Sequence, residues 1–353
     1  MREIRGLEAM QEALREEMSR DEKVFILGEC VRMGSLGISA GLADKFGNNR
    51  VLDTNISECA IAGSCLGAAL AGYRPIGDIL CSDFFYIVAD EMCNKAAKWR
   101  FRHGGKPKKL PIVYMSSIGG YVRSDAEHSQ TLESIIMHCP GLKLAIPSTP
   151  YDAKGLLKTA IRDDNPVVYL YHKLLMPMKG KVPEEEYTIP FGVADIKREG
   201  KDVTVVATGY MVQMALDVAN QLQEKGVSIE VIDPRTLEPL DIDTIVDSVR
   251  KTRRVVIVDE DTLRCGVTAE IAVQIMEKAF DELDAPIQRV AAANCPIPAG
   301  WFLEQYVLPY PKDIIVAIQR VLGRDVGPVE VKGPTSSLVE LLEVGGIMKE
   351  KGK

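Results

Sequence analysis

The sequence predicts an α/β protein built from two doubly wound domains, and three observations lead to this prediction. Short apolar runs, typical of strands buried in a parallel sheet, recur along the chain. Segments with helical spacing separate these runs, as the crossover connections between parallel strands require. The length of 353 residues, at about 150 residues per domain, favours two domains.

Within the first 180 residues, segments with helical spacing alternate with short apolar runs typical of strands. Leu7, Met10, Leu14 and Met18 recur at helical spacing, which predicts the first helix. Strands are expected after it at residues 24–27, 76–80, 111–115, 142–146 and 167–171. Helices are expected between them at residues 58–71, 85–98, 130–138 and 152–162.

The predicted first domain spans residues 1–180, and a stretch rich in Pro, Lys and Glu predicts a linker at residues 181–200. A second, smaller domain is expected at residues 201–325. Its expected strands are 203–207, 229–232 and 255–258, and its expected helices are 211–225, 242–251 and 268–280. Residues 326–353 are expected to form a loosely held extension, with one amphipathic turn around Leu338 to Leu342 and a basic end.

Charge and composition exclude several classes of protein. The net charge of -7 gives no support for binding nucleic acid or an anionic membrane. The longest uncharged apolar stretch, residues 59–73, is shorter than the roughly 20 residues of a membrane-spanning helix. Charged residues at the start, without an apolar run behind them, favour a cytoplasmic protein. Eight scattered Cys form no zinc pattern, and the dinucleotide and P-loop fingerprints are missing.

Two residues are candidates for chemistry. Ser57 is suited to cap a helix that opens with Glu58 and continues as an apolar, Gly-containing run. Glu58 then has two interpretations: a partner of the helix dipole, or an acid in an apolar cleft that exchanges a proton with a heteroaromatic nitrogen. His128, just before a predicted helix, is either a surface residue or a loop residue that takes part in catalysis.

Several motifs, taken in order, resemble those of a known family. They are Asp53-Thr-Asn55-Ile-Ser57-Glu58, Gly63-Ser-Cys-Leu-Gly67, His128-Ser129-Gln130, Pro147-Ser-Thr-Pro150 and Glu230-Val-Ile-Asp233-Pro-Arg235. Together they resemble the β subunit of the E1 component of 2-oxo acid dehydrogenases, and acetoin dehydrogenase β subunits share most of them. The resemblance extends over residues 5–322 and implies a transketolase-like fold, with a pyrimidine-binding domain and a transketolase C-terminal domain.

The resemblance also implies a cofactor, thiamine diphosphate, and roles for individual residues. Glu58 matches the acid that hydrogen-bonds N1′ of the cofactor's aminopyrimidine, and Phe84 matches the aromatic residue that packs on that ring. His128 matches a histidine that serves the substrate or acyl transfer. Five residues match positions that often hold a structural potassium ion: Ile112, Ala160, Ile161, Asp163 and Asn165.

One absence implies a partner. Enzymes of this family bind the diphosphate through Mg²⁺ at a Gly-Asp-Gly motif, whereas here Gly77-Asp78 is followed by Ile79. The resemblance therefore implies an α subunit that carries the motif and holds most of the Mg²⁺ site, in an α2β2 tetramer.

The resemblance implies decarboxylation of a 2-oxo acid or cleavage of an acyloin, with transfer of the acyl group to a lipoyl-E2 acceptor. Met115 and Tyr171 replace an arginine and a glutamate that are common in the family, which is expected to change the charge near the cleft and leaves the substrate open. Asn294 replaces an aspartate that helps some relatives to dock E2, which leaves the E2 contact open. One alternative is a stand-alone thiamine enzyme of the same fold that performs carboligation or non-redox C–C cleavage without E2. The other is a non-catalytic structural homologue, and Glu58 and His128 argue against it.

Overall fold

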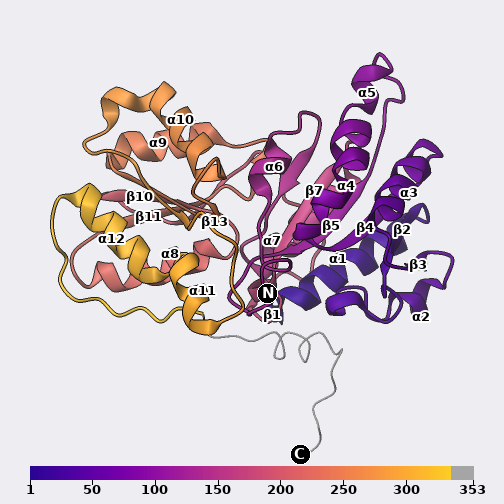
Figure 1. Ribbon diagram of the computed structural model, residues 1–353, viewed down its shortest axis with the longest axis horizontal. Helices are drawn as coiled ribbons and strands as arrows, with labels where there is room; N and C mark the ends of the chain where they lie inside the picture. Colours follow the sequence, from indigo (N-terminus) through magenta and orange to yellow (C-terminus); the bar gives the residue numbers. More distant parts are fainter. Residues whose placement is uncertain (335–353) are drawn as a thin grey trace, which may run out of the picture.

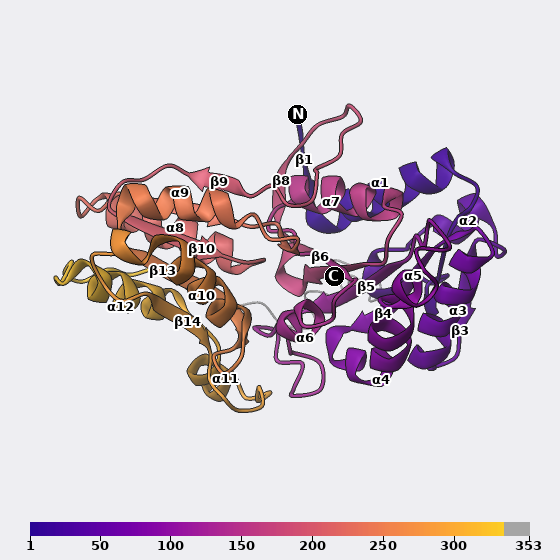
Figure 2. The same ribbon diagram turned by 90° about the horizontal axis from the view of Figure 1, so that it is seen from above.

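Two α/β lobes lie side by side in the computed structural model, which describes residues 1–334 (Figure 1). The first lobe holds a sheet of seven strands and the second a sheet of five. Seen from above, the lobes stay separate and the short helix α6 (Glu133–Met137) lies between them (Figure 2). The predicted fold class, two α/β units with mainly parallel sheets, is confirmed.

The seven-stranded sheet has the order β12-β6-β7-β5-β4-β2-β3. Its six strands from the first lobe are all parallel, as their continuous apolar sequences predict. The seventh, β12 (Thr236–Glu238), comes from the second lobe and adds antiparallel to β6. The other bounds are β2 (Val24–Glu29), β3 (Val51–Thr54), β4 (Arg74–Cys81), β5 (Val113–Ile118), β6 (Lys143–Ala145) and β7 (Val167–His172).

Helices cover both faces of this sheet. One face packs against α1 (Gly6–Arg20) and α7 (Pro150–Arg162), and the other against α3 (Glu58–Leu70), α4 (Phe85–Ala89) and α6. The helix predicted at 85–98 changes after α4 into a π-helix, η3 (Asp90–Ala96). The helix predicted at 130–138 is shorter than expected, because Gln130 is held in a loop by Asp83. The short helices α2 (Leu42–Phe46) and α5 (Trp99–Arg102) were not predicted.

The five-stranded sheet has the order β14-β13-β10-β11-β9. Its central strands, β10 (Val203–Ala207), β11 (Ile229–Asp233) and β13 (Val255–Thr262), are the predicted ones. The edge strands β9 (Asp195–Arg198) and β14 (Gln288–Ala292) were not predicted, since each is short and mixes polar with apolar residues. The helices are α8 (Met211–Gln223), α9 (Ile242–Thr252), α10 (Val267–Ala279), α11 (Trp301–Val307) and α12 (Pro311–Leu322).

The stretch expected to be a linker contains ordered strands. β8 (Lys179–Val182) pairs antiparallel with β1 (Arg2–Arg5), and β9 joins the second sheet. At the start of the expected extension, Val326, Val329 and Val331 pack against the core of the second lobe. The amphipathic turn around Leu338 to Leu342 and the basic end lie outside the described residues.

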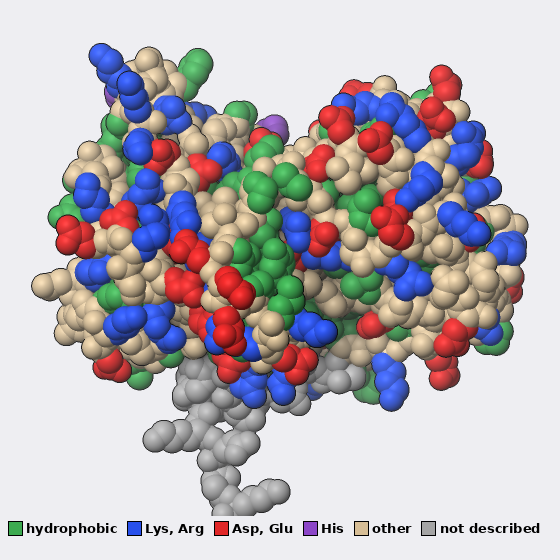
Figure 3. All heavy atoms as spheres, turned by 180° about the vertical axis from the view of Figure 1, so that it is seen from behind, with side chains coloured by type: hydrophobic (Ala, Val, Ile, Leu, Met, Phe, Trp, Pro, Cys, Tyr) green, Lys and Arg blue, Asp and Glu red, His purple; other side chains and the backbone are tan. Residues whose placement is uncertain are grey.

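The surface between the lobes is less charged than the rest. From behind, hydrophobic side chains gather in the depression between the two lobes, and acidic and basic side chains intersperse elsewhere (Figure 3). None of the helices described within residues 1–334 is long and apolar enough to cross a membrane.

Candidate active site

The first candidate residue, Glu58, opens helix α3 as predicted. Ser57 occupies the position before it, but its hydroxyl donates to the carbonyl of Asn55 at 2.9 Å and makes no bond to the helix. The predicted side-chain cap is therefore wrong, because the Ser57 hydroxyl is already used in the preceding turn. Glu58 thus lies in the first turn of α3, where the backbone N–H groups have no helical partners.

Glu58 is largely buried, with 8 % of the residue exposed. Within residues 1–334 its side chain accepts no hydrogen bond and forms no ion pair. A second acid, Glu29 at the end of β2, lies close by: burial and the charge of Glu58 raise the pKa of Glu29. A buried polar group without a partner is costly, so Glu58 is poised for a ligand atom that can share a proton with it.

Phe84 and His128, predicted from positions far apart in the sequence, meet in the structure. Their rings pack edge to face, with centroids 5.4 Å apart and planes at 85°. Phe84 is half-buried at the end of the short helix η2 (Ser82–Phe84), and His128 is exposed in the loop that follows β5. The thiol of Cys59 donates to the carbonyl of Ile87 at 3.0 Å, which ties the start of α3 to α4. This contact keeps Glu58 on the same side of the sheet as Phe84.

The loop that carries His128 is fixed to the segment that carries Phe84. The hydroxyl of Ser82 donates to the carbonyl of Gln130 at 2.8 Å, and the Gln130 side chain donates to Asp83 at 2.9 Å. Asp83 is buried, and its second carboxylate oxygen has no hydrogen bond from the described residues. These contacts hold the His128 loop against the segment that carries Phe84, and Glu58 lies on the same side of the sheet.

Of the five residues implied for potassium, Ala160 and Ile161 lie at the end of α7 and Asp163 and Asn165 in the loop after it, whereas Ile112 stands just before β5. The carbonyls of Ile161 and Asp163 both accept from Arg74 at 3.0 Å, and the side chain of Asn165 accepts from Arg100. The carbonyl of Ile112 accepts from Val167 at 2.8 Å. Carbonyl oxygens are suitable ligands for a hard cation, but a cation here would share them with a guanidinium.

Met115 and Tyr171 do not lie in a cleft. Both are buried in the cluster under α1 and α7, on the opposite sheet face from α3 and α4. The expectation that they change the charge near the substrate is therefore wrong, because successive residues of β5 and β7 point to opposite faces of the sheet.

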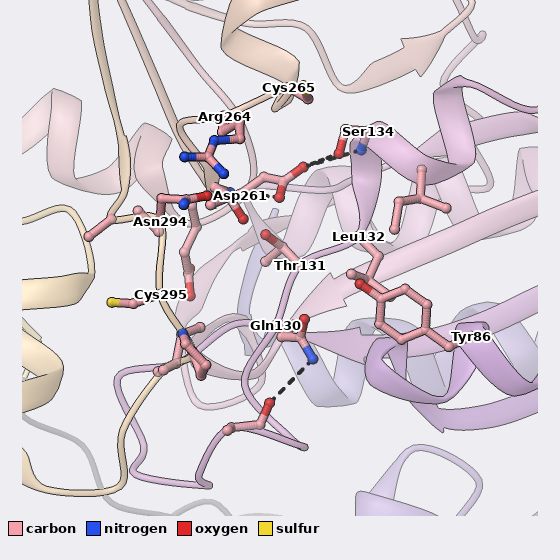
Figure 4. A pocket seen from close by; sticks show the side chains of 18 residues that line it. Tyr86, Gln130, Thr131, Leu132, Ser134, Asp261, Arg264, Cys265, Asn294 and Cys295 are labelled. Carbon is pink, nitrogen blue, oxygen red and sulfur yellow. Dashed lines mark hydrogen bonds between the residues drawn. The ribbon is translucent and has the colours of Figure 1, made fainter.

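A cavity of about 570 Å³ lies where the two lobes meet (Figure 4). Tyr86, Gln130 and Thr131 line it from the first lobe, and Asp261 and Arg264 from the second. With its amide suitably oriented, Asn294 accepts hydrogen bonds from both terminal nitrogens of Arg264, at 3.2 and 3.1 Å. Neither Glu58, Phe84 nor His128 is among the residues that line this cavity. The cavity adjoins the His128 loop but is distinct from the Glu58 site.

A buried group of acids stands behind this cavity. Ser134 of α6 donates to Asp261 at 2.5 Å and so joins the lobes (Figure 4). Burial, together with Asp259 and Asp261, raises the pKa of Glu133 well above its usual value. Burial and the charge of Asp261 raise the pKa of Asp259 to about 7. In residues 1–334 no group of three or more His, Cys, Asp or Glu is arranged to hold a metal ion.

Sequence reasoning missed Glu29, Lys173 and Arg264. Glu29 and Lys173 stand at or just after the carboxyl ends of parallel strands, where α/β proteins place their sites, and that rule could have found them. Arg264 gave no such signal, since its place beside Asn294 depends on how the second lobe folds.

Comparison with known proteins gives two matching family models. Residues 2–179 match the transketolase pyrimidine-binding domain, and residues 192–314 match the transketolase C-terminal domain. A solved split-gene transketolase, described as an inactive β4 tetramer, aligns with a TM-score of 0.74 and 22% identity over 91% of this chain and 98% of that chain. At this identity the structure shows the fold alone.

Curated relatives are more similar in sequence. The acetoin:2,6-dichlorophenolindophenol oxidoreductase subunit beta of Bacillus subtilis (strain 168) is 44% identical over 330 residues, 90% of this chain and 96% of that protein. The pyruvate dehydrogenase E1 component subunit beta of Rickettsia felis is 45% identical over 316 residues, 89% and 97% of the two chains. The corresponding pyruvate dehydrogenase subunit of Bacillus subtilis is 42% identical over 325 residues, 91% and 99% of the two chains.

Proposed function

Since this chain belongs to the transketolase-fold family of E1 β subunits, we propose that it is the β subunit of a heteromeric enzyme dependent on thiamine diphosphate. The proposed reaction is decarboxylation of a 2-oxo acid or cleavage of an acyloin such as acetoin, followed by transfer of the acyl group to a lipoyl-E2 acceptor. The observation that carries this proposal is the buried, unpaired carboxylate of Glu58 on the same side of the sheet as the Phe84 and His128 pair.

The residues fit the pyrimidine half of this cofactor. When bound, thiamine diphosphate supplies a thiazolium carbon that attacks the carbonyl carbon of the substrate. Glu58 shares a proton with ring nitrogen N1′, which its unpaired and partly desolvated carboxyl is able to do. Phe84 packs on the aminopyrimidine and keeps water away from it. His128, exposed and in contact with Phe84, moves a proton at the substrate.

The diphosphate half of the site is proposed to come from a partner. The chain has no Gly-Asp-Gly motif, and its described residues offer no metal-binding group of acids, His or Cys. We therefore propose an α subunit that carries the motif and holds the Mg²⁺, in an α2β2 assembly with its active sites at the α/β interfaces.

A potassium ion at Ile112, Ala160, Ile161, Asp163 and Asn165 is proposed as a structural element. Ala160 and Ile161 lie in the last turn of α7, where the carbonyl of Ala160 accepts from the N–H of Asp163 at 3.3 Å and that of Ile161 from Arg74 at 3.0 Å. Because Arg74 already donates to two of the carbonyls, the ion would stabilise the loop at 163–165 only modestly. A melting temperature that is the same in potassium chloride and in tetramethylammonium chloride would contradict this role.

A second candidate function is that of a stand-alone thiamine enzyme, which performs carboligation or non-redox C–C cleavage without E2. Asn294 favours this function. In some relatives an aspartate at this position helps to dock E2, whereas here the residue is uncharged and pairs with Arg264. Loss of a charge at a charge-paired interface weakens docking. Turnover trials with and without an added lipoyl domain separate the two functions.

Native mass spectrometry of the complex isolated from its source, in Mg²⁺ and thiamine diphosphate, tests the proposal. The expected result is a heterotetramer with two bound cofactors. In a separate activity assay, the same complex should turn over pyruvate or acetoin with a dye acceptor. A cofactor-free homo-oligomer without a partner would contradict the shared site and favour a non-catalytic protein.

A further inference from the structure

We propose that Lys173 is a positioning residue, whose side chain sets the location of His128 by bridging the two ends of the loop that carries it. The inference rests on the proposed function, because it concerns how the catalytic role given to His128 is maintained. The loop at residues 119–128 follows β5, and Lys173 follows β7, the strand next to it in the sheet.

The ammonium group of Lys173 holds both ends of this loop. Its Nζ donates to the carbonyl of Gly119 at 2.9 Å and to the carbonyl of His128. Gly119 is the first residue after β5, and His128 is nine positions further on. A single side chain therefore closes the loop through two main-chain carbonyls.

A lysine side chain is suited to the buried position at residue 173. The residue is 4 % exposed, and its three donors and long stem let one charge serve two carbonyls inside the protein. Burial lowers the pKa of Lys173, whereas the nearby thiol of Cys81 and the carboxylates of Asp83, Glu260 and Glu304 act in the opposite direction. An uncharged apolar side chain of the same length would leave both carbonyls buried without donors.

The preceding residue, His172, links the start of the same loop to Glu260 of the second lobe. The backbone N–H of Leu174 donates to His172 Nδ1 at 3.0 Å, so Nε2 carries the hydrogen and donates to Glu260 at 2.8 Å. The other oxygen of Glu260 accepts from the N–H of Gly120 at 2.5 Å. At Gly119, where φ is +94°, a side chain would lie 2.0 Å from His172 Nε2, so only glycine fits.

The imidazole of His128 depends on this backbone anchor. Among the described residues its only ring contact is with the edge of Phe84, and it makes no side-chain hydrogen bond. Because catalytic groups must be held within a fraction of an ångström of their working position, release of the His128 carbonyl would misplace the ring.

The test uses the assembled enzyme with its partner subunit, with pyruvate and acetoin as the substrates tried. Lys173→Met, His128→Ala and the double variant are compared with the wild type. We expect Lys173→Met to lower kcat about 10- to 100-fold, while the Kd for thiamine diphosphate stays within about twofold because Glu58 and Phe84 are untouched. In the His128→Ala background, the same Lys173→Met change should cause no further loss of kcat.

Lys158→Met is the matched control, since Lys158 is equally buried but pairs with Glu16 on α1, far from the loop. It should lower stability without lowering kcat. Lys173→Arg, which keeps a cationic donor, should recover part of the activity. If Lys173→Met fails to assemble, Lys173→Gln, which keeps an amide donor, replaces it in the same comparison.

Two results would overturn the inference: unchanged kcat in Lys173→Met, or a loss of the same size with and without His128. A wild-type rate in His128→Ala would instead contradict the role of His128 in the proposed function. The experiment therefore distinguishes failure of the inference about Lys173 from failure of the role proposed for His128.

Discussion

A buried acid without a partner, as at Glu58, lowers the stability of a fold unless a ligand uses it. Burial of an unpaired polar group costs about 1–3 kcal/mol in mutational data. Asp152, by contrast, is a buried acid with two cationic partners, Lys197 and Arg235. The ligand atom proposed to bind at Glu58 would offset the cost there.

Replacement of Glu58 by Gln should abolish most turnover of the assembled enzyme, by about 100-fold or more, because an amide cannot exchange a proton with a ring nitrogen. Assembly should persist, since the side chain has the same shape and no protein partner to lose. Steady-state kinetics and native mass spectrometry on the same preparation measure the two effects.

Glu270→Gln is the control for this change, since Glu270 also lies in the first turn of a helix but is exposed on the second lobe. Its activity should be that of the wild type. If Glu58→Gln kept most of the activity, the proton-sharing role would be wrong.

The contact between α6 and β13 joins the lobes through acids whose charges repel. Glu133, Asp259 and Asp261 are buried together, and burial is the first cause of the raised pKa of each. At neutral pH these three carboxyl groups can stay buried side by side only because some of them remain protonated.

This arrangement predicts a pH dependence of stability. Between pH ~4, where carboxyls of the unfolded chain titrate, and pH about 7, where Asp259 titrates in the folded chain, the folded state binds more protons. The free energy of unfolding contributed by these groups therefore falls as pH rises through this window. Asp259→Asn should flatten the slope, measured by urea unfolding from pH 5 to 8.

The exposed Asp243→Asn provides the control, and its slope should match that of the wild type. A slope that is unchanged in Asp259→Asn would show that the buried acids do not govern this pH dependence.

An ion network near β9 joins the lobes a second time. Lys197 contacts Asp152 at 2.6 Å, Asp195 at 2.8 Å and Asp233 at 3.4 Å. Burial acts against the charge of Lys197, but Asp233 and Asp152 outweigh it and raise its pKa. The network places the edge strand of the second sheet against the start of α7.

Lys197→Met should lower the free energy of unfolding by about 3 kcal/mol, because it leaves buried carboxylates without one of their cations. Urea unfolding measures this change. Lys278→Met, which breaks an exposed pair with Asp243, should cost under about 1 kcal/mol. Equal losses in the two variants would contradict a special role for the buried network.

At the scale of the whole molecule, the strand β12 of the second lobe extends the sheet of the first, so the two lobes form one folded unit. In the proposed function this unit supplies the pyrimidine half of an active site. It has no Gly-Asp-Gly motif for a metal diphosphate, and we propose that the partner subunit supplies those groups.

This division predicts how the isolated chain binds ligands. Without its partner it should bind thiamine and thiamine diphosphate with Kd values within a few-fold of each other, since only the pyrimidine is recognised. With the partner and Mg²⁺, the diphosphate form should bind far more tightly. Isothermal titration measures both, and a strong preference of the isolated chain for the diphosphate would mean that it holds a complete site.

The sequence by itself determined the fold class, the central strands and the helix that begins at Glu58. These features follow from local apolar periods, which report burial on one or both faces of an element. It also indicated Glu58, Phe84 and His128 as candidates, because their motifs could be matched residue by residue. It could not find the short edge strands β9 and β14, which mix polar with apolar residues, nor the shortened α6.

Only the tertiary structure decided which distant residues meet. It brought Phe84 to His128, placed Lys173 under the His128 loop, and moved Met115 and Tyr171 into the core. Such contacts join residues from different strands and from both lobes, through hydrogen bonds and packing that no local pattern encodes. Their geometry depends on how sheets and loops pack against one another, and that packing exists only in the folded chain.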